Sequence, residues 1–229
     1  MKIYFVRHGR PDYKTDTLTE LGIKQAQAAA ERLKDCNIQR VFASSKGRAM
    51  QTAQYTAEAF GLDVIPCDFI REIDWFSVDG EPIPCNGQPW MIAERHVSEG
   101  ISLSDFDWAK DELFSKSRVV NSYKTVCDGL DSWLEELGYK REGEYYRVTG
   151  KDTWDSVAMF SHAGSSSAAL SHMFNIPFPQ LCAMVDIECT SVTVLELLNK
   201  TGELVSPKFR ILNDAKHIAD ISVENFYGN

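Results

Sequence analysis

The sequence predicts an α/β fold, because short apolar strands alternate with helical segments along much of the chain. Residues 2–6 form a β-branched and aromatic run without Gly or Pro, which is typical of a strand buried on both faces. Residues 41–43 and 155–160 repeat the pattern, and a helical segment follows each of the three strands. Open α/β sheets carry their chemistry just beyond the carboxyl ends of strands, so these ends are the first places to look for a site.

Composition narrows the class of protein. A chain of 229 residues can form one large α/β domain or a domain with a substantial insertion. A formal charge of −9 argues against a nucleic-acid surface, and the absence of any run of eighteen apolar residues argues against a membrane span. Six scattered cysteines without a C-x-x-C pair indicate reduced thiols rather than a zinc site. We therefore expect a cytoplasmic protein with no nucleic-acid or membrane partner. The sequence does not indicate the oligomeric state.

The first third of the chain continues the strand and helix pattern. Residues 11–17 are polar and predict a loop, and Thr19 is a good N-cap for an Ala-rich helix over residues 23–34. A second helix follows the strand at 41–43 and runs to about residue 60. A third strand is expected at residues 62–65.

The middle of the chain looks like an insertion. Pro and Gly interrupt residues 75–110, where only 90–95 suggest a short helix. Residues 111–137 have helical periodicity, and the Tyr-rich residues 138–150 suggest a hairpin. We predict one domain over residues 1–229, with an insertion or lid at about 76–150.

The C-terminal part returns to the α/β pattern. The strand at 155–160 leads into a helix over 165–174, which ends near Pro177. Residues 190–198 and 208–212 predict an antiparallel pair of strands, and the tail from Asp214 is expected to be exposed.

Basic and polar residues follow two of the strands. Arg7 and His8 suit an anionic substrate with the imidazole as nucleophile or acid/base, although a basic surface loop would look the same. Ser44 and Ser45, with the first N–H groups of the next helix and Arg48, could form a seat for an anion. The alternative is that one serine caps the helix and Arg48 is solvated.

Two further candidates lie later in the chain. Glu72 is a carboxylate at a strand-to-loop exit, where an ordinary solvated acid is the alternative. The Ser161-His162-Ala163-Gly164 segment repeats the arrangement at His8, with an imidazole at a strand end beside a helix N-terminus.

In their order along the chain, these segments resemble the histidine phosphatase superfamily, also called the phosphoglycerate mutase-like family. Residues 18–22 also look like the segment that leads into that family's first helix. The resemblance covers residues 1–75 and 155–200 but hardly 76–150. It implies a three-layer α/β sandwich, with a mostly parallel central sheet, helices on both faces and a helical insertion or lid. Ala-Gly after the second histidine is similar to the mutase and small-phosphatase branch.

The resemblance also implies roles for the candidate residues. His8 would be the nucleophile that forms a phosphohistidine, and Glu72 would protonate the leaving group. The phosphoryl oxygens would be bound by Arg7, Arg48 and His162, with the Ala163 N–H and Ser44 as further contacts. Many members carry an acidic residue at the position of Arg10, which either extends the anion pocket or faces solvent. No metal or other cofactor is implied, because the arginines take the place that Mg²⁺ fills elsewhere.

The implied activity is metal-independent hydrolysis of a small phosphorylated metabolite, with that substrate or inorganic phosphate as the partner. A phosphoglycerate-type mutase is the close alternative, and a non-catalytic protein that binds a phosphorylated ligand is a third. We favour hydrolysis because the 76–150 insertion is unlike the mutase pattern. Within the insertion, Arg95 and His96 are the residues best suited to contact an anion. The sequence does not identify the phosphoester.

Overall fold

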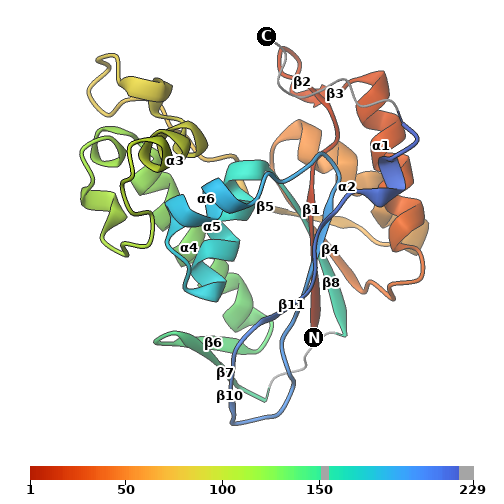
Figure 1. Ribbon diagram of the computed structural model, residues 1–229. Helices are drawn as coiled ribbons and strands as arrows, with labels where there is room; N and C mark the ends of the chain where they lie inside the picture. The colour runs from red at the N-terminus through yellow and green to blue at the C-terminus, as the bar shows by residue number, and fades with distance from the viewer. Residues whose placement is uncertain (151–154, 222–229) are drawn as a thin grey trace.

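A six-stranded sheet forms the centre of the protein (Figure 1). The computed structural model describes residues 1–150 and 155–221. The strand order is β11-β9-β1-β8-β4-β5, and β9 alone runs antiparallel to its neighbours, so the sheet is mostly parallel as predicted. The strands are β1 (Lys2–Arg7), β4 (Arg40–Ser44), β5 (Val64–Cys67), β8 (Ser156–Ser161), β9 (Val192–Glu196) and β11 (Lys208–Asp214).

The register between β1 and β8 determines which strand ends meet. These two strands are parallel neighbours, and Arg7 pairs with Ser161. The backbone N–H of His8 extends the ladder by donating to the Ser161 carbonyl at 2.9 Å. Parallel pairing in this register therefore brings His8 and His162 side by side at the carboxyl edge of the sheet.

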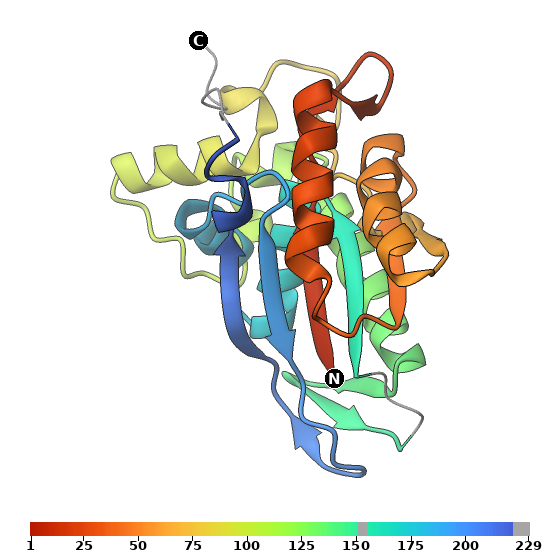
Figure 2. The same ribbon diagram turned by 90° about the vertical axis from the view of Figure 1, so that its right-hand side faces the viewer.

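Two helices cover one face of the sheet, α1 (Glu20–Leu33) and α2 (Gly47–Phe60) (Figure 2). Alanines such as Ala29 and Ala53 are fully buried there and let the helices approach the strands closely. The predicted cap is confirmed, since the Thr19 hydroxyl accepts the Gly22 N–H at 3.1 Å.

The expected exposed tail is wrong over its first residues. β11 continues to Asp214, and a 3₁₀ turn, η5 (Lys216–Ile218), packs against α1 with Ile218 only 3% exposed. Burial of this one apolar side chain stabilises the turn by about 2 kcal/mol. The segment is otherwise largely polar, so its sequence pattern does not indicate that it packs against a helix. Residues 222–229 of the tail lie outside the described residues.

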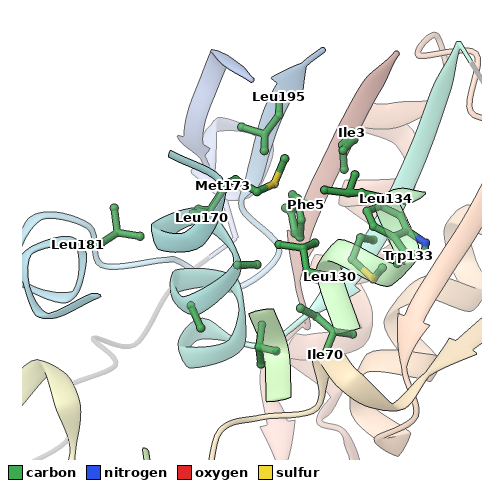
Figure 3. Packing of buried hydrophobic residues seen from close by; sticks show 14 of the residues in the cluster. Ile3, Phe5, Ile70, Leu130, Trp133, Leu134, Leu170, Met173, Leu181 and Leu195 are labelled. Atoms are coloured by element: carbon green, nitrogen blue, oxygen red, sulfur yellow. The ribbon is translucent and has the colours of Figure 1, made fainter. Parts of the chain in front are cut away.

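The opposite face carries α4 (Val119–Glu136), α5 (Ala163–Phe174) and α6 (Phe178–Met184) (Figure 1). Large apolar side chains fill the space between these helices and the sheet (Figure 3), among them Ile3, Phe5, Leu130, Trp133, Leu134, Leu170 and Met173. Helices on both faces confirm the three-layer sandwich predicted above. The part of the chain that the structure describes contains no helix long and apolar enough to span a membrane.

Most of the insertion consists of short helical elements joined by irregular loops. It contains α3 (Pro89–Ser98) and the 3₁₀ turns η2 (Pro84–Gly87), η3 (Trp108–Lys110) and η4 (Phe114–Lys116), with η1 (Asp68–Ile70) just before it. The helix predicted from residue 111 begins only at Val119. The Asp111 carboxylate accepts the Phe114 N–H at the start of η4, so it serves a turn instead. The Ser117 hydroxyl accepts the Val119 N–H where α4 begins and lies within hydrogen-bonding distance of the Trp75 and Gly87 carbonyls, which ties this point to the insertion.

Two hairpins complete the fold. β6 (Tyr139–Glu142) and β7 (Tyr145–Val148) form the hairpin predicted at 138–150, and β10 (Leu204–Val205) adds a third strand. β2 (Pro11–Asp12) and β3 (Thr17–Leu18) pair where a loop was expected. This second hairpin follows β1 directly and lies beyond the end of the sheet opposite the N-terminus (Figure 1), and His8 is the first residue after β1.

Candidate active site

The site is built around two buried imidazoles. The His8 and His162 ring centroids are 5.0 Å apart with an edge-to-face arrangement, and both side chains are almost completely covered. The Gly9 N–H donates to the Thr52 hydroxyl at 3.1 Å, which ties the backbone after His8 to α2. His162 is the N-cap residue of α5, and its N–H donates to the Ser165 hydroxyl. Strand and helix ends therefore fix both rings.

Hydrogen bonding selects one tautomer of His8. Its Nδ1 lies 2.7 Å from the Gly9 carbonyl, which can only accept, so Nδ1 carries the proton. Its Nε2 lies 3.2 Å from Nε of Arg48, which can only donate. The Nε2 lone pair therefore points toward the Arg48 guanidinium, which is the state a nucleophilic imidazole requires.

Burial and neighbouring cations keep both histidines neutral. Loss of hydration is the main cause that lowers the pKa of His8 to about 3, and the Arg7 charge adds to it. The pKa of His162 is also lowered well below its usual value, first by burial and then by its charged surroundings. Both rings are therefore neutral at neutral pH.

Arg48 reaches the site from the first turn of α2. Its side chain is 9% exposed; Nε donates to His8, and Nη1 forms an ion pair with Asp16. The Thr52 hydroxyl, one turn later, donates to the Arg48 backbone carbonyl and accepts the Gly9 N–H. Thr52 therefore contacts the backbone of both Arg48 and the residue that follows His8. The guanidinium is thus directed at His8 by the helix that presents it.

Arg7 supplies the second guanidinium. It is the last residue of β1, is 8% exposed, and donates from Nη1 to the Ile187 carbonyl. Its charge acts on His8, His162 and Glu72, which places it electrostatically within the same cluster. Two buried cations beside neutral imidazoles leave the site positive and suited to a dianion.

Glu72 lies against the N-terminus of α5. Its Oε1 accepts the Ile73 N–H at 3.1 Å and the Ser165 N–H at 3.2 Å. A Cβ at Gly164 would come within 2.8 Å of the same oxygen, so the glycine permits this close approach. Glu72 keeps some exposure, yet the protein around its carboxyl removes enough hydration to raise its pKa, against the lowering effect of Arg7. A raised pKa favours a carboxyl group that holds a proton.

Ser44 contacts the second histidine instead of capping the helix. Its hydroxyl lies 2.8 Å from Nε2 of His162 and also accepts the Lys46 N–H. Lys46 is the N-cap residue of α2, and Ser45 donates to Asp68. Ala163 is the first residue of α5, where backbone N–H groups have no partner within the helix.

The remaining anion-binding candidates have other contacts. The Arg10 backbone is held by Gln25 and Thr19, and its charge acts with that of Arg7 on the Cys189 thiol. In the insertion, Arg95 pairs with Glu99 along the exposed side of α3, and the buried His96 pairs with Asp111 at 2.9 Å. The structure therefore does not bring the two insertion residues to His8.

Two contacts of the site were not foreseen. Thr52 lies four residues after Arg48, and this spacing on a helix could have predicted that the two residues share a face. Asp16 carries no local signal, because only the folding of the β2–β3 hairpin brings it to Arg48. Within the described ranges no group of three or more His, Cys, Asp or Glu side chains is arranged to hold a metal ion.

Comparisons with known proteins show the family and the fold to which this chain is similar. The model of the histidine phosphatase superfamily (branch 1) matches residues 3–209. A probable phosphoglycerate mutase GpmB of Proteus mirabilis (strain HI4320) is 36% identical over 83 residues, which are 32% of this chain and 39% of that protein. The matched region thus spans well under half of this curated relative.

Solved structures extend the similarity to nearly the whole chain. A mycobacterial glucosyl-3-phosphoglycerate phosphatase, Rv2419c, gives a TM-score of 0.63 at 24% identity, covering 93% of this chain and 98% of that one. Bacillus stearothermophilus YhfR gives 0.62 at 18% identity, covering 95% and 98%. At these identities the likeness shows a shared fold.

The neutral burial of His8 predicts an acid-sensitive fold. In the unfolded chain His8 titrates near 6.5, whereas in the folded chain its pKa is about 3. Between these values the unfolded chain binds the extra proton, so the free energy of unfolding falls as the pH falls. From about pH 6 to pH 5, wild type should lose about 1 kcal/mol more stability than His8→Gln, measured by urea unfolding. Equal losses in the two proteins would contradict neutral burial of this ring.

Proposed function

The chain belongs to the histidine phosphatase superfamily (branch 1), and we propose that it is a metal-independent phosphomonoester hydrolase that forms a phosphohistidine at His8. One observation carries this proposal above the others. The Nδ1–H of His8 is committed to the Gly9 carbonyl, so the Nε2 lone pair faces the guanidinium of Arg48. A neutral, oriented imidazole beside two buried arginines is what attack on a phosphoryl dianion needs.

The first step transfers the phosphoryl group to the protein. The Nε2 lone pair forms the N–P bond while the P–O bond to the leaving group breaks. The hydrogen bond that the Nε–H of Arg48 donates to Nε2 of His8 is replaced by one to a phosphoryl oxygen. Arg7 and His162 stabilise the charge on the other phosphoryl oxygens. The positive charge that develops on the imidazole is shared with the Gly9 carbonyl through Nδ1–H.

Glu72 completes this step as the general acid. Because its Oε1 already accepts two backbone N–H groups, the proton is held on Oε2. The raised pKa favours retention of this proton until the leaving oxygen takes it, and the arriving dianion raises the pKa further.

The second step returns the site to its starting state. Glu72, now a carboxylate, accepts a proton from water as the water oxygen attacks phosphorus. The N–P bond breaks, inorganic phosphate forms, and His8 is neutral again. One carboxyl group thus acts first as acid and then as base.

A phosphoglycerate-type mutase is the second candidate. The curated relatives that match a third of this chain are named as probable phosphoglycerate mutases. The same phosphohistidine would then pass its phosphoryl group to a second hydroxyl of the substrate instead of to water. We favour water because Arg95 and His96, the insertion residues best suited to hold a second acidic group, are paired with Glu99 and Asp111 instead.

Release of inorganic phosphate from a panel of small phosphomonoesters tests the function. With EDTA present throughout, we expect turnover by wild type and by His217→Ala, a histidine outside the cluster. His8→Ala should lower turnover at least about a hundredfold, because no other group supplies the nucleophile. More than a few per cent of activity in His8→Ala, or loss on chelation that metal restores, would overturn the proposal.

The acid role of Glu72 predicts dependence on the leaving group. Glu72→Gln should slow hydrolysis of alkyl phosphates on the order of a hundredfold, because an alkoxide needs a proton as it departs. Activated aryl phosphates should be slowed much less in the first step, which a burst of phenol in stopped-flow measurements isolates. If both classes slow equally, Glu72 is not the acid.

A further inference from the structure

The β2–β3 hairpin places a carboxylate against the start of α2. Asp16 has a φ of 54°, in the left-handed region that Asp tolerates better than most residues. A Cβ at Gly47 would lie 2.4 Å from the Asp16 carbonyl oxygen, so a glycine is needed for the hairpin to dock this closely. The hairpin tip is therefore packed onto the helix that presents Arg48.

The Asp16 carboxylate bonds to two consecutive residues of that helix. Oδ2 accepts the Gly47 N–H at 2.9 Å, and Oδ1 pairs with Nη1 of Arg48. Partial burial acts to raise the pKa of Asp16, but these two partners outweigh it and lower the pKa. The carboxylate is thus ionised and occupies the helix N-terminus that the sequence suggested as an anion seat.

Arg48 connects this carboxylate to the nucleophile. Its Nη1 faces Asp16, its Nε faces Nε2 of His8, and the Tyr13 ring lies 5.4 Å from the guanidinium carbon. A guanidinium is a rigid plane, so a partner that fixes one edge also directs the other. Holding a long, flexible side chain in one geometry costs conformational entropy, which these contacts offset before substrate arrives.

We propose that Asp16 is a positioning residue, which acts through Arg48 to keep the Nε–H of that arginine directed at the reacting end of His8. This inference rests on the proposed function, since it assigns a purpose to a contact of the same site. The Asp16 carboxylate bonds to Gly47 and Arg48, whereas its charge acts on His8 only as the smallest of several influences on the pKa of that ring. Its geometric effect on His8 therefore passes through the guanidinium.

The charge of Asp16 gives this role a distinctive signature. One guanidinium separates the carboxylate from the place where a phosphoryl dianion would bind, so the carboxylate opposes anion binding while it orients the arginine. Removing Asp16 should lower kcat without weakening the binding of phosphate. A residue that merely supported the local fold would, when removed, impair both.

The first measurement follows the Arg48 Nε–H directly. Its NMR signal, assigned by its loss in Arg48→Lys, should exchange with solvent slowly in wild type and faster in Asp16→Ala. Asp12→Ala is the matched control, because it removes the same charge from the same hairpin at a carboxylate that accepts the Lys14 N–H. Unchanged exchange in Asp16→Ala would overturn the proposal.

The second measurement separates turnover from binding. Asp16→Ala should lower kcat on the order of tenfold, and Asp16→Asn should recover part of it through its remaining acceptor oxygen. The Kd of inorganic phosphate, by calorimetry, should stay the same or fall in both variants. An unchanged kcat, or a lower kcat together with a higher Kd, would refute a positioning role.

Failure of the proposed function would look different. If wild type hydrolyses no ester in the panel, the hydrolase assignment fails, while the exchange of the Arg48 Nε–H still decides whether Asp16 holds the guanidinium.

Discussion

The site depends on the parallel pairing of β1 with β8. The register that pairs Arg7 with Ser161 brings two strand ends together, and each is followed by a histidine. A shift of one residue would turn alternate side chains to the other face and separate the rings. The β1 core residues Ile3 and Phe5, packed under α4 and α5, hold that register (Figure 3). Core packing on one side of the sheet thus determines geometry at its edge.

The same burial moves the pKa values of the site in opposite directions. It makes the charged form of an imidazole costly and so keeps His8 neutral, while it makes a carboxylate costly and so favours a protonated Glu72. A neutral His8 and a raised Glu72 pKa are therefore both properties of one poorly hydrated cluster, and they are what the proposed nucleophile and acid need. Because both imidazoles are neutral, Arg7 and Arg48 supply the positive charge that binding of a dianion requires.

The fold class and the strand ends were predictable because they rest on local patterns: apolar runs, Ala-rich helices and a polar cap at Thr19. The structure brings together His8, Arg48 and His162, as the order of their motifs suggested. Longer-range polar contacts were not predictable. Ser117 lies against the Trp75 carbonyl where α4 begins, and Asp16 meets Arg48 only through the folded hairpin. The packing of η5 on α1 depends on tertiary structure in the same way. The roles of the site residues stay predictions.

Trapping the covalent intermediate tests the central claim most directly. Wild type would be mixed with a radiolabelled phosphomonoester, quenched in base after a few milliseconds, digested, and the labelled peptide sequenced by mass spectrometry. Phosphate on His8 that is stable in base and lost in acid is the predicted result. Turnover with no labelled peptide, or with the phosphate on any other residue, would contradict the phosphohistidine account.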